Sequence, residues 1–479
     1  MQICIRAGRG LWVELQFAKQ ICIRAGFASP LTLVAMDLDA IFKAYDIRGL
    51  APEQLTTEAA RAIGVGFADF AKVPAIAVGH DCRLTSPGLS DAVIEGITSR
   101  GTDVVYLGEI TTDMLYYFSG AEDLPGLVIT ASHNPPEYNG MKLCLAGAAP
   151  VGEDTGLGEI KSIALDHESS AAAAGSVTER DALAGYVDHL FSIVDVEAFS
   201  PMRVAIDGGN GMAGVAVPDV FGRTPAEVIG LYLEPDGTFP NHPADPLRPE
   251  NLVDLQALMA QEMPAFGIAF DGDADRAFFV DDQGVALPGS TTTAVIANWF
   301  LAREPGAKIV HNLICSKAVP ETVRAAGGEP IRTRVGHSYI KQIMKETGAV
   351  FGGEHSAHFY FRDNYRADSG ILASLVLMQI MSEDGRPLSE IRKDFEPYAQ
   401  SGEVNFKVVA KVEAMAAVEV AFAPGVPDRL DGLTVDMGDR WLNLRPSNTE
   451  PVLRLNVEAP SPSDVAAIVD HVSEILERY

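Results

Sequence analysis

Cysteine is scarce in this sequence, with five residues among 479, scattered and odd in number. This excludes a disulfide framework and indicates reduced thiols, so we expect a cytoplasmic protein. No apolar run approaches the length that spans a bilayer, which argues against a membrane protein. Basic residues are also few, 37 against 65 acidic ones, and the net charge of −28 argues against binding to nucleic acids or anionic membranes. An anionic ligand would need a locally basic site.

The length exceeds what one typical core can organise, and 47% hydrophobic with 21% charged residues is typical of a soluble globular protein. The N-terminal stretch stands apart, because the heptapeptide QICIRAG occurs at 2–8 and again, unchanged, at 20–26. A seven-residue repeat is too short for a solenoid, and two identical copies are too similar for a structural repeat. We expect Met36 to be the natural start and residues 1–36 to be a disordered or non-native extension.

After this extension, strand-like apolar runs alternate with amphipathic or alanine-rich helical stretches, which is the pattern of α/β proteins. Strands are expected at 75–78, 104–107 and 127–129 in a first βαβ domain. The low-complexity segment 167–175 is expected to be a surface loop or linker. From about Gly402 the pattern changes to longer alternating strands and two helices.

The loop 130–142, TASHNPPEYNGMK, follows the apolar run 127–129 directly. The end of a strand is the usual place for reactive groups in open α/β sheets, and the two prolines forbid a regular helix immediately afterwards. Such a loop can hold Ser132 as a nucleophile or phosphoryl acceptor, with His133 and Lys142 near enough to supply positive charge or move protons. The alternative is an ordinary connection in which a polar side chain caps the next helix.

A glycine-rich turn, DGGNGMAG at 207–214, follows the strand expected at 203–206 and fits the G-x-G-x-x-G spacing of a dinucleotide loop. A nicotinamide or flavin enzyme is therefore a competing hypothesis. Glu234 lies at roughly the required distance downstream, but in a turn rather than at a strand end.

The segment 271–276, DGDADR, follows another apolar run and carries Asp271, Asp273 and Asp275. Carboxylates at alternate positions on a short loop can converge on one hard cation, and oxygen ligands are those that magnesium prefers. An EF-hand is disfavoured because Arg276 stands where that loop needs glycine. A solvated turn without a metal is the alternative.

Two later loops carry candidate ligand-binding groups. In GGEHSAH at 352–358, the set Glu354, His355 and His358 has the composition of a zinc site but not the spacing, so binding of a polyol by Glu354 and Ser356 is the better reading. The segment 445–454, RPSNTEPVLR, is rich in donors suited to a phosphate: two arginines and Ser447, Asn448 and Thr449.

A hydroxyl, a cation site and a phosphate clamp together indicate phosphoryl transfer. The sequence has no Walker loop or kinase signature, so the phosphoryl group should come from the substrate or from the enzyme itself.

From about Ile41 to the C-terminus the chain resembles the α-D-phosphohexomutase superfamily, in its phosphomannomutase/phosphoglucomutase branch. The motifs occur in the order of the family: FKAYDIRG, TASHNPPEYNGMK, DGGNGMAG, PDGTFPNHPADPLRPENL, DGDADR, VGHSYIK, GEHSAH and RPSNTEPVLR. The resemblance implies an α/β fold with four-domain phosphohexomutase architecture, in which three related mixed-sheet α/β domains and a smaller C-terminal α+β domain surround a central cleft. The expected domains are 37–178, 179–283, 284–398 and 399–479.

The same resemblance implies a role for each matching residue. Ser132 would be the phosphoserine and would hold one Mg²⁺ per chain together with Asp271, Asp273 and Asp275. The other catalytic groups would be His133, Lys142 and Arg276. The substrate would be bound by Tyr45, Arg48, His337, Glu354, Ser356, His358, Arg445, Ser447, Asn448 and Thr449.

The implied reaction interconverts mannose 6-phosphate and mannose 1-phosphate through a hexose 1,6-bisphosphate, which also acts as an activator. The partners would be small hexose phosphates, and the protein would be a monomer or a dimer. His355 and Ala357 depart from residues found in many relatives, in a pattern that resembles phosphomannomutases more than the other branches. Phosphoglucomutase and phosphoglucosamine mutase activities stay open, because Ile314 departs from the family as well. Ile314 replaces a basic residue that some members use on the substrate.

Two hypotheses from other classes remain. The stretch 33–41, LVAMDLDAI, resembles the strand end of aspartyl phosphatases, with Asp37 as nucleophile, although it lacks the usual following Gly-Thr. The other is a non-catalytic sugar-phosphate-binding protein, against which the retention of Ser132 with three aspartates speaks.

Overall fold

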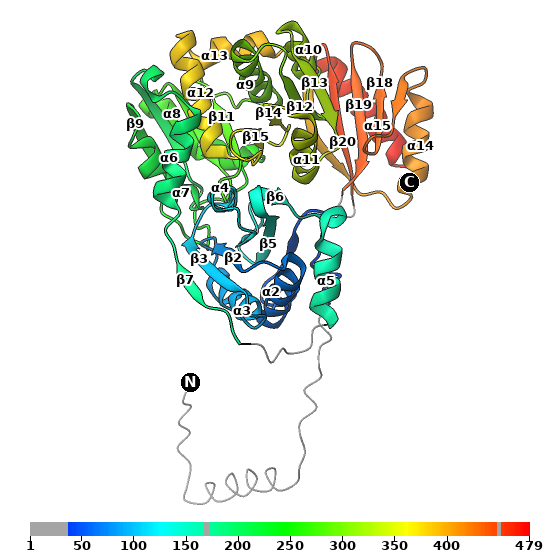
Figure 1. The fold of residues 1–479 in the computed structure, drawn as a ribbon. Helices are drawn as coiled ribbons and strands as arrows, with labels where there is room; N and C mark the ends of the chain where they lie inside the picture. The colour runs from blue at the N-terminus through cyan, green and yellow to red at the C-terminus, as the bar shows by residue number, and fades with distance from the viewer. Residues whose placement is uncertain (1–36, 167–172, 448–451) are drawn as a thin grey trace, which may run out of the picture. The chain divides into compact units, whose positions relative to one another are not determined.

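The computed structural model of this chain describes residues 37–166, 173–447 and 452–479 (Figure 1). Its contacts separate residues 1–37 from one compact unit, residues 38–479, which contains every helix and strand discussed here. The expected extension 1–36 lies outside the described residues. Among those described, no helix has the length and apolar character needed to cross a membrane. Residues 39–41 form a turn, and residues 33–36, which would supply the strand of the phosphatase-like reading of Asp37, lie outside the described residues.

The first sheet combines parallel and antiparallel strands in the order β1-β5-β4-β2-β3-β7, with β6 paired to β5. Its strands are β1 (Ile47–Leu50), β2 (Ala75–His80), β3 (Asp103–Glu109), β4 (Gly126–Ile129), β5 (Tyr138–Leu145), β6 (Ala149–Pro150) and β7 (Val177–Glu179). Its helices are α2 (Thr57–Ala71), α3 (Ser86–Thr98), α4 (Thr112–Glu122) and α5 (Leu157–Asp166). The three strands that the sequence predicts here are confirmed.

The second sheet has the order β11-β10-β8-β9 and the third has the order β13-β12-β14-β15. The second unit contains α6 (Leu183–Ile193), β8 (Met202–Asp207), α7 (Ala213–Phe221), β9 (Ala226–Leu231), α8 (Val253–Glu262), β10 (Phe266–Phe270) and β11 (Ala277–Val280). The third contains α9 (Gly289–Arg303), β12 (Lys308–Asn312), α10 (Ala318–Ala325), β13 (Glu329–Thr333), α11 (His337–Thr347), β14 (Phe351–Gly353), β15 (Phe359–Phe361), α12 (Gly370–Asp384) and α13 (Leu388–Ile391).

These three sheets share one topology. The strand orders β5-β4-β2-β3, β11-β10-β8-β9 and β15-β14-β12-β13 each place three parallel strands beside one antiparallel strand at the end of the path. Central parallel strands are covered on both faces, which is why β10 is apolar throughout and all five of its residues are buried. The expectation of three related mixed-sheet α/β domains is therefore confirmed.

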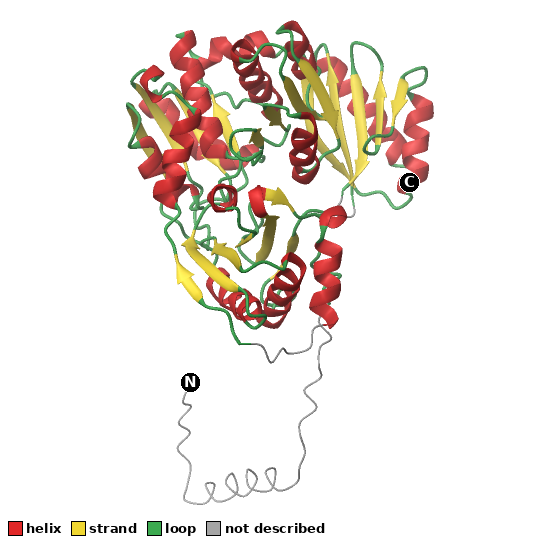
Figure 2. Ribbon diagram, in the orientation of Figure 1, coloured by secondary structure: helices red, strands yellow, loops and turns green. Residues whose placement is uncertain are grey.

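The C-terminal unit is built differently, from five antiparallel strands in the order β16-β20-β19-β18-β17 with two helices (Figure 2). Its elements are β16 (Ala399–Phe406), α14 (Lys411–Ala421), β17 (Val426–Asp428), β18 (Leu433–Asp436), β19 (Trp441–Pro446), β20 (Leu453–Ala459) and α15 (Pro462–Leu476). This confirms the expected α+β domain. Short 3₁₀ helices elsewhere cover Ala146–Ala148, Glu153–Thr155, Val196–Ala198, Pro249–Leu252 and Arg392–Phe395.

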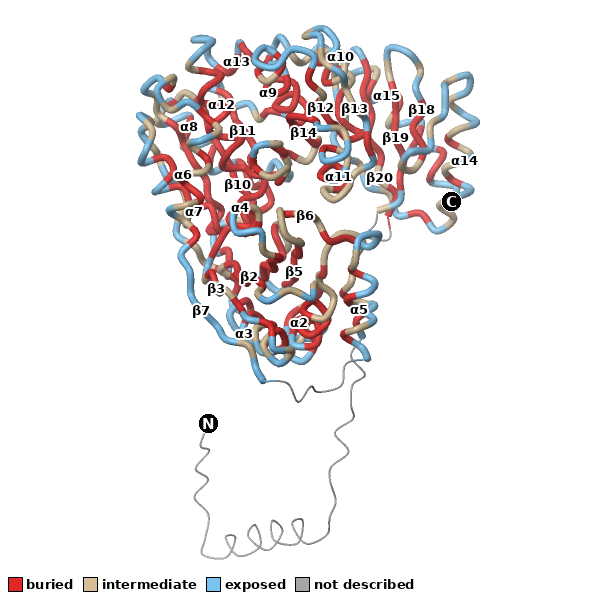
Figure 3. Tube along the Cα trace, in the orientation of Figure 1, coloured by how far each residue is buried: buried red, intermediate tan, exposed pale blue. Residues whose placement is uncertain are grey.

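Buried side chains form one large apolar core that runs through the first three sheets, and a separate core inside the C-terminal unit. Figure 3 shows the buried chain concentrated in the sheets and the exposed chain on outer helices and turns. The first three domains are thus packed as one body, whereas the fourth has its own apolar interior.

A buried carboxylate ties the first domain to helix α6 of the second unit and to the third domain. Asp113, on α4, accepts hydrogen bonds from Thr111 Oγ1, from Tyr186 OH at 2.5 Å and from Ser369 Oγ at 2.5 Å. Ser369 also caps the N-terminus of α12. Burial raises the pKa of Asp113 to about 6, against the lowering effect of the three hydroxyl donors.

Replacing this carboxylate should change how stability depends on pH. Because the pKa of Asp113 is higher in the folded chain, the folded state binds a proton that the unfolded state has lost, and wild-type stability falls as pH rises through about 4 to 6. The difference in unfolding free energy, wild type minus Asp113→Asn, should decrease by up to about 3 kcal/mol between pH 4 and pH 7. Denaturant unfolding at several pH values measures it, with Asp188→Asn on the exposed side of α6 as control. A constant or growing difference would contradict the assignment.

Candidate active site

Loops from different sheets meet around a cavity of about 130 Å³. They include the β4–β5 connection with Ser132, the β10–β11 connection and the β14–β15 connection, and the first two follow the carboxyl ends of buried parallel strands. The cavity is lined by Tyr45, Asp46, Arg48, Tyr116, Ser132, His133, Lys142, Asp275, Arg276, His337, His358 and Asp368. Nine of these were predicted from the sequence; Asp46, Tyr116 and Asp368 were not.

Ser132 faces the carboxylates of the neighbouring domain. Its Oγ donates to Asp271 Oδ2 at 2.8 Å and accepts from Arg276 Nη2 at 3.3 Å. Its backbone has φ of 49°, the left-handed region that serine rarely adopts, and its N–H donates to Thr130 Oγ1 at 3.0 Å. The hydroxyl is therefore held toward the metal loop by both its backbone and its side-chain partners.

His133 lies beside this hydroxyl, with Nδ1 3.3 Å from Ser132 Oγ. Burial, together with the positive charges of Arg276 and Arg48, holds the pKa of His133 well below its usual value. The ring is therefore neutral at pH 7 and can accept a proton. The sequence suggested positive charge or proton transfer for this position, and the lowered pKa of His133 argues against a fixed positive charge.

Lys142 was expected on the loop, but it lies inside strand β5, which begins two residues after the second proline. This part of the expectation is wrong, because both prolines precede the segment that pairs with β4 and β1, and Lys142 lies within that segment. Lys142 Nζ donates to Asp273 Oδ2 at 2.6 Å and to Asp275 Oδ2 at 2.5 Å. Burial lowers the pKa of Lys142, but the two carboxylates outweigh it and raise the pKa above its usual value. Its ammonium is thus a fixed positive charge.

The three aspartates of the β10–β11 connection converge, with one ligand atom from each within 4.8 Å of the others. All three are buried, and Asp273 Oδ1 and Asp275 Oδ1 accept no hydrogen bond. Burying carboxylate oxygens that accept no hydrogen bond costs free energy unless a cation binds them, and these hard oxygen ligands fit Mg²⁺. The residues present therefore fit a divalent cation.

With all three carboxylates ionised, the charges around this loop do not balance without such a cation. Lys142 and Arg276 supply two positive charges, and Arg276 lies 2.9 Å from Asp271 Oδ2. Three carboxylates exceed them by one, and a phosphate on Ser132 would add more negative charge. Burial raises the pKa of Asp271 to about 8, although Arg276 acts in the opposite direction. A bound cation would compete with that proton.

The β14–β15 connection approaches the metal loop through His358. His358 Nε2 lies 3.6 Å from Asp275 Oδ1, and its Nδ1 lies 3.1 Å from Ser356 Oγ. Glu354 is buried beneath these groups and does not line the cavity, because its carboxylate accepts from Tyr360 OH at 2.8 Å and Asn312 Nδ2 at 3.0 Å. Of the two residues predicted to bind a polyol, Glu354 is thus engaged by other side chains, whereas the Ser356 hydroxyl lies beside His358.

The cavity is also lined by Tyr45, Arg48 and His337. Tyr45 OH donates to Val335 O at 3.0 Å, and its ring lies 5.8 Å from that of His337. Arg48 Nη1 donates to Asn134 Oδ1 at 2.6 Å, and its other terminal nitrogen pairs with Asp46. Burial lowers the pKa of His337 to about 4, so this ring is neutral at pH 7.

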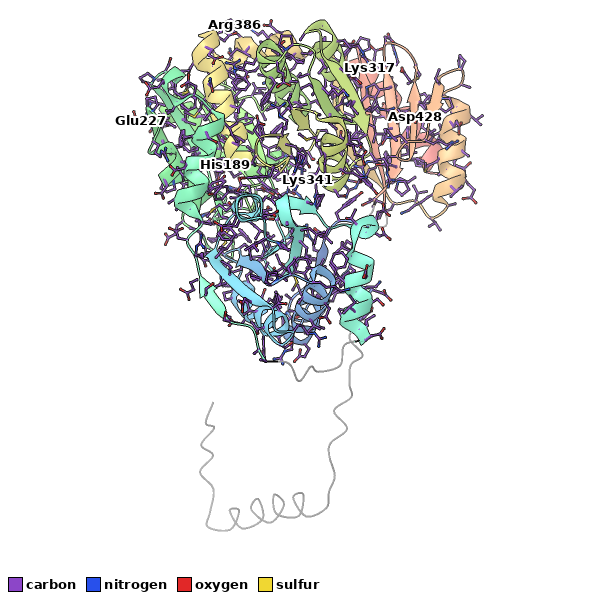
Figure 4. All side chains as sticks on the ribbon, in the orientation of Figure 1. His189, Glu227, Lys317, Lys341, Arg386 and Asp428 are labelled. Carbon is purple, nitrogen blue, oxygen red and sulfur yellow. The ribbon has the colours of Figure 1, made fainter. Side chains whose placement is uncertain are left out.

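The sequence reasoning missed a buried ion pair at the back of the cavity. Lys341, labelled in Figure 4, lies one helical turn after His337, and its Nζ is 2.7 Å from Asp368 Oδ1. The same ammonium lies 3.6 Å from the centre of the Tyr116 ring, which belongs to the first domain. Lys341 closes the quoted VGHSYIK motif, and its spacing from His337 was the available signal.

The described residues of the predicted phosphate clamp, Arg445 and Ser447, lie in the C-terminal unit and do not line the cavity. Arg445 is buried, and its Nη2 lies 3.2 Å from Glu403; Arg454 Nη1 lies 3.3 Å from the same carboxylate. Burial lowers the pKa of Arg445, and Glu403 opposes this. Ser447 N donates to Val452 O at 3.0 Å. Asn448 and Thr449 lie outside the described residues.

Ile314 does not line the cavity either. Its side chain is buried in a small apolar cluster with Leu313 and Trp441, which joins the third domain to the C-terminal unit. At this position the chain makes an interdomain contact instead of the substrate contact expected from a basic residue.

The glycine-rich turn at 207–214 is explained by close packing. A Cβ on Gly211 would lie 2.7 Å from the carbonyl oxygen of Gly272, and one on Gly214 would lie 1.6 Å from that of Leu233. Met212 N also donates to Gly272 O at 2.9 Å. The turn thus supports the metal loop from behind, a use of glycine that needs no nucleotide.

Three α/β domains and one α+β domain around a hydroxyl and three carboxylates define a multidomain phosphoryl-transfer enzyme. Matches to phosphoglucomutase/phosphomannomutase family models make this more specific: alpha/beta/alpha domain I at 39–170, domain II at 184–284, domain III at 288–398 and the C-terminal domain at 403–475. The chain belongs to the phosphohexomutase superfamily and is an isomerase that acts as an intramolecular phosphotransferase. Members usually use a metal ion, and the aspartate triad could bind one.

Individual relatives cover almost the whole chain. It is 39% identical over 439 residues to the phosphohexose mutases of Xanthomonas campestris pv. campestris, covering 91% of this chain and 98% of the relative. It is 39% identical to a phosphomannomutase of Escherichia coli K12, with 87% and 94% covered. The crystal structure of a phosphoglucomutase/phosphomannomutase family protein from Burkholderia thailandensis aligns with a TM-score of 0.83 at 31% identity, covering 92% of this chain and 97% of that one.

Removing one aspartate should abolish the response to a divalent cation. Mg²⁺ should raise the thermal midpoint of the wild type, because a ligand at a hundred times its Kd adds about 2.7 kcal/mol of stability. Asp273→Asn should respond far less, since it loses a buried carboxylate, one oxygen of which accepts no hydrogen bond. Thermal unfolding with Mg²⁺ or EDTA measures this, with the exposed Asp219→Asn as control. An undiminished response in Asp273→Asn would rule out this loop as the cation site.

Proposed function

We propose that this enzyme interconverts mannose 6-phosphate and mannose 1-phosphate through a phosphoserine at Ser132 and a hexose 1,6-bisphosphate. The observation that carries the proposal is the 2.8 Å hydrogen bond from Ser132 Oγ to Asp271, which places a hydroxyl at the edge of the carboxylate cluster. Relatives named phosphomannomutase, at 37 to 39% identity, support the choice of sugar.

The first transfer moves the phosphoryl group from Ser132 Oγ to the free hydroxyl of the hexose monophosphate. The O–P bond at Ser132 breaks and leaves its electron pair on Oγ, a new O–P bond forms on the sugar oxygen, and the proton of the sugar hydroxyl must be passed on to Ser132 Oγ. His133, neutral and beside the serine, is placed to take it. After the bisphosphate turns over, the second transfer returns the other phosphoryl group to Ser132.

Charge stabilisation in both transfers comes from fixed cations. Lys142 and Arg276 hold positive charge against the aspartates and beside Ser132 Oγ, so no reorganisation is needed as charge moves between oxygens. Mg²⁺, one per chain and held by Asp271, Asp273, Asp275 and Ser132, would act as a Lewis acid on the transferring group.

The rest of the set binds the substrate without reacting. Tyr45, Arg48, His337 and His358 line the cavity in which the sugar would turn. Glu354 and Ser356 are the residues that the resemblance assigns to the sugar hydroxyls, although neither lines the cavity in this structure. Arg445, Ser447, Asn448 and Thr449 would hold the phosphate that is not being transferred. A clamp that reads only phosphate suits a substrate that must bind in two orientations.

Glucose phosphates remain additional candidate substrates, and glucosamine phosphate is the alternative outcome. Added hexose 1,6-bisphosphate would activate the enzyme by restoring the phosphate on Ser132. A cytoplasmic location and a monomeric or dimeric state remain predictions from the sequence.

Replacing the phosphoryl carrier tests the mechanism. Ser132→Ala should lower mutase turnover by about 10³-fold or more, because no other group can carry the phosphoryl between the two half-reactions. Turnover of mannose 1-phosphate with added glucose 1,6-bisphosphate measures this, and Ser192→Ala on the exposed side of α6 is the control. Undiminished turnover in Ser132→Ala would sink the phosphoserine assignment, and an inactive wild type would favour a binding protein.

A comparison of sugars tests the specificity. The value of kcat/KM should be highest for mannose 1-phosphate and at least about tenfold lower for glucosamine 1-phosphate, a difference of about 1.4 kcal/mol in transition-state binding. The three 1-phosphates of mannose, glucose and glucosamine would be assayed under identical bisphosphate and Mg²⁺ concentrations. A clear preference for the glucosamine compound would overturn the proposed substrate.

A further inference from the structure

Arg83 is a fully buried arginine that does not line the cavity. It lies in the connection between β2 and α3, and its guanidinium reaches under the loop that carries Ser132. Nη2 donates to Ser132 O at 2.8 Å and to Asn134 O at 2.7 Å. Nη1 donates to Pro135 O at 2.7 Å and to Tyr138 O at 3.1 Å.

These four carbonyls and one carboxylate account for all five N–H donors of the guanidinium, because Nε donates to Asp81 Oδ2 at 3.2 Å. Asp81 is itself fixed by Ser86 Oγ at 2.5 Å and by the backbone N–H of Arg83 at 3.0 Å. The ring of Phe239, from the second domain, lies 5.0 Å from Arg83 Cζ and covers the group. The arginine is therefore locked in position from both sides.

The carbonyl of Ser132 is the important acceptor. It also abuts the metal loop, since a Cβ on Gly272 would lie only 2.3 Å from it. Ser132 has φ of 49°, a conformation that persists only when its surroundings hold it. The adjacent prolines restrict their own φ but cannot orient the peptide that follows Ser132.

We propose that Arg83 is a positioning residue for phosphoryl transfer, which orients Ser132 Oγ toward the carboxylate cluster by holding the carbonyls of the loop. The inference rests on the proposed function of Ser132 as the phosphoryl carrier. Lysine at this position would keep the charge but offers three donors from a single point, so it cannot satisfy four spread carbonyls and Asp81 together.

Arg83→Lys tests this proposal, with Arg223→Lys, an exposed arginine on the second domain, as control. Misplacing a reacting group by about 1 Å can cost about 10²-fold, so kcat should fall by about 10- to 100-fold while KM for mannose 1-phosphate changes less than about threefold. The rate at which glucose 1,6-bisphosphate phosphorylates Ser132, followed by intact mass spectrometry, should fall in parallel. The thermal midpoint reports on the fold.

Chemical rescue separates positioning from general loss of structure. In Arg83→Ala, millimolar guanidinium chloride should restore part of kcat and of the Ser132 phosphorylation rate, and ammonium chloride at equal ionic strength should not. Wild-type kcat and phosphorylation rate in Arg83→Lys would overturn the inference. So would a loss of kcat in both variants that guanidinium does not restore and that follows the loss of thermal midpoint. A wild type that never becomes phosphorylated on Ser132 would instead refute the proposed function.

Discussion

The active site depends on the burial of three carboxylates from one short loop. Removing such charges from water costs several kcal/mol each unless partners compensate. Lys142, from the first domain, compensates Asp273 and Asp275, and Thr112 Oγ1 donates to Asp273 Oδ2 at 2.6 Å. The contacts that neutralise the cation site therefore also join the first domain to the second. A change that loosened this interface would disturb the relation between Ser132 and the aspartates at once.

The third domain is joined to the same loop by its backbone. Arg276 and His358 form an antiparallel bridge, and Gly370 N donates to Ala274 O at 3.3 Å. The C-terminal unit differs, because its core is separate. It meets the third domain through a small cluster with Trp441, through Glu458, which accepts from Lys317 N at 2.9 Å, and through the ion pairs Lys317–Asp436 and Arg332–Asp428. Domains joined by contacts of this kind commonly move relative to each other. The predicted phosphate clamp therefore lies on the domain that shares least of its core with the others.

The sequence predicts best the features that depend on local pattern. Apolar runs at 127–129 and 267–270 are buried strands, and the serine and aspartate loops follow them directly, so pattern and position suffice there. Lys142 shows the limit of local pattern. The prolines and the glycine near it predict a loop, but Lys142 lies in strand β5. The Lys341–Asp368 pair joins residues 27 apart in sequence, and its existence depends on tertiary packing. The neutrality of His133 likewise follows from its burial, which cannot be predicted from the spacing of residues in the sequence.

An acidic chain that binds a phosphorylated sugar was expected to need a locally basic site, and the structure shows how this is achieved. The cations near the cavity and clamp are held by carboxylates: Arg48 by Asp46, Lys341 by Asp368, and Arg445 with Arg454 by Glu403. A phosphate approaching Arg48 or Arg445 therefore meets a guanidinium that is already oriented but paired. If these arginines hold phosphate as we propose, binding would exchange one anion for another, because bidentate phosphate contacts are stronger than the 3.2 Å and 3.3 Å contacts of Glu403. A protein with a net charge of −28 could in this way keep its arginines oriented by carboxylates until a dianionic ligand displaces them.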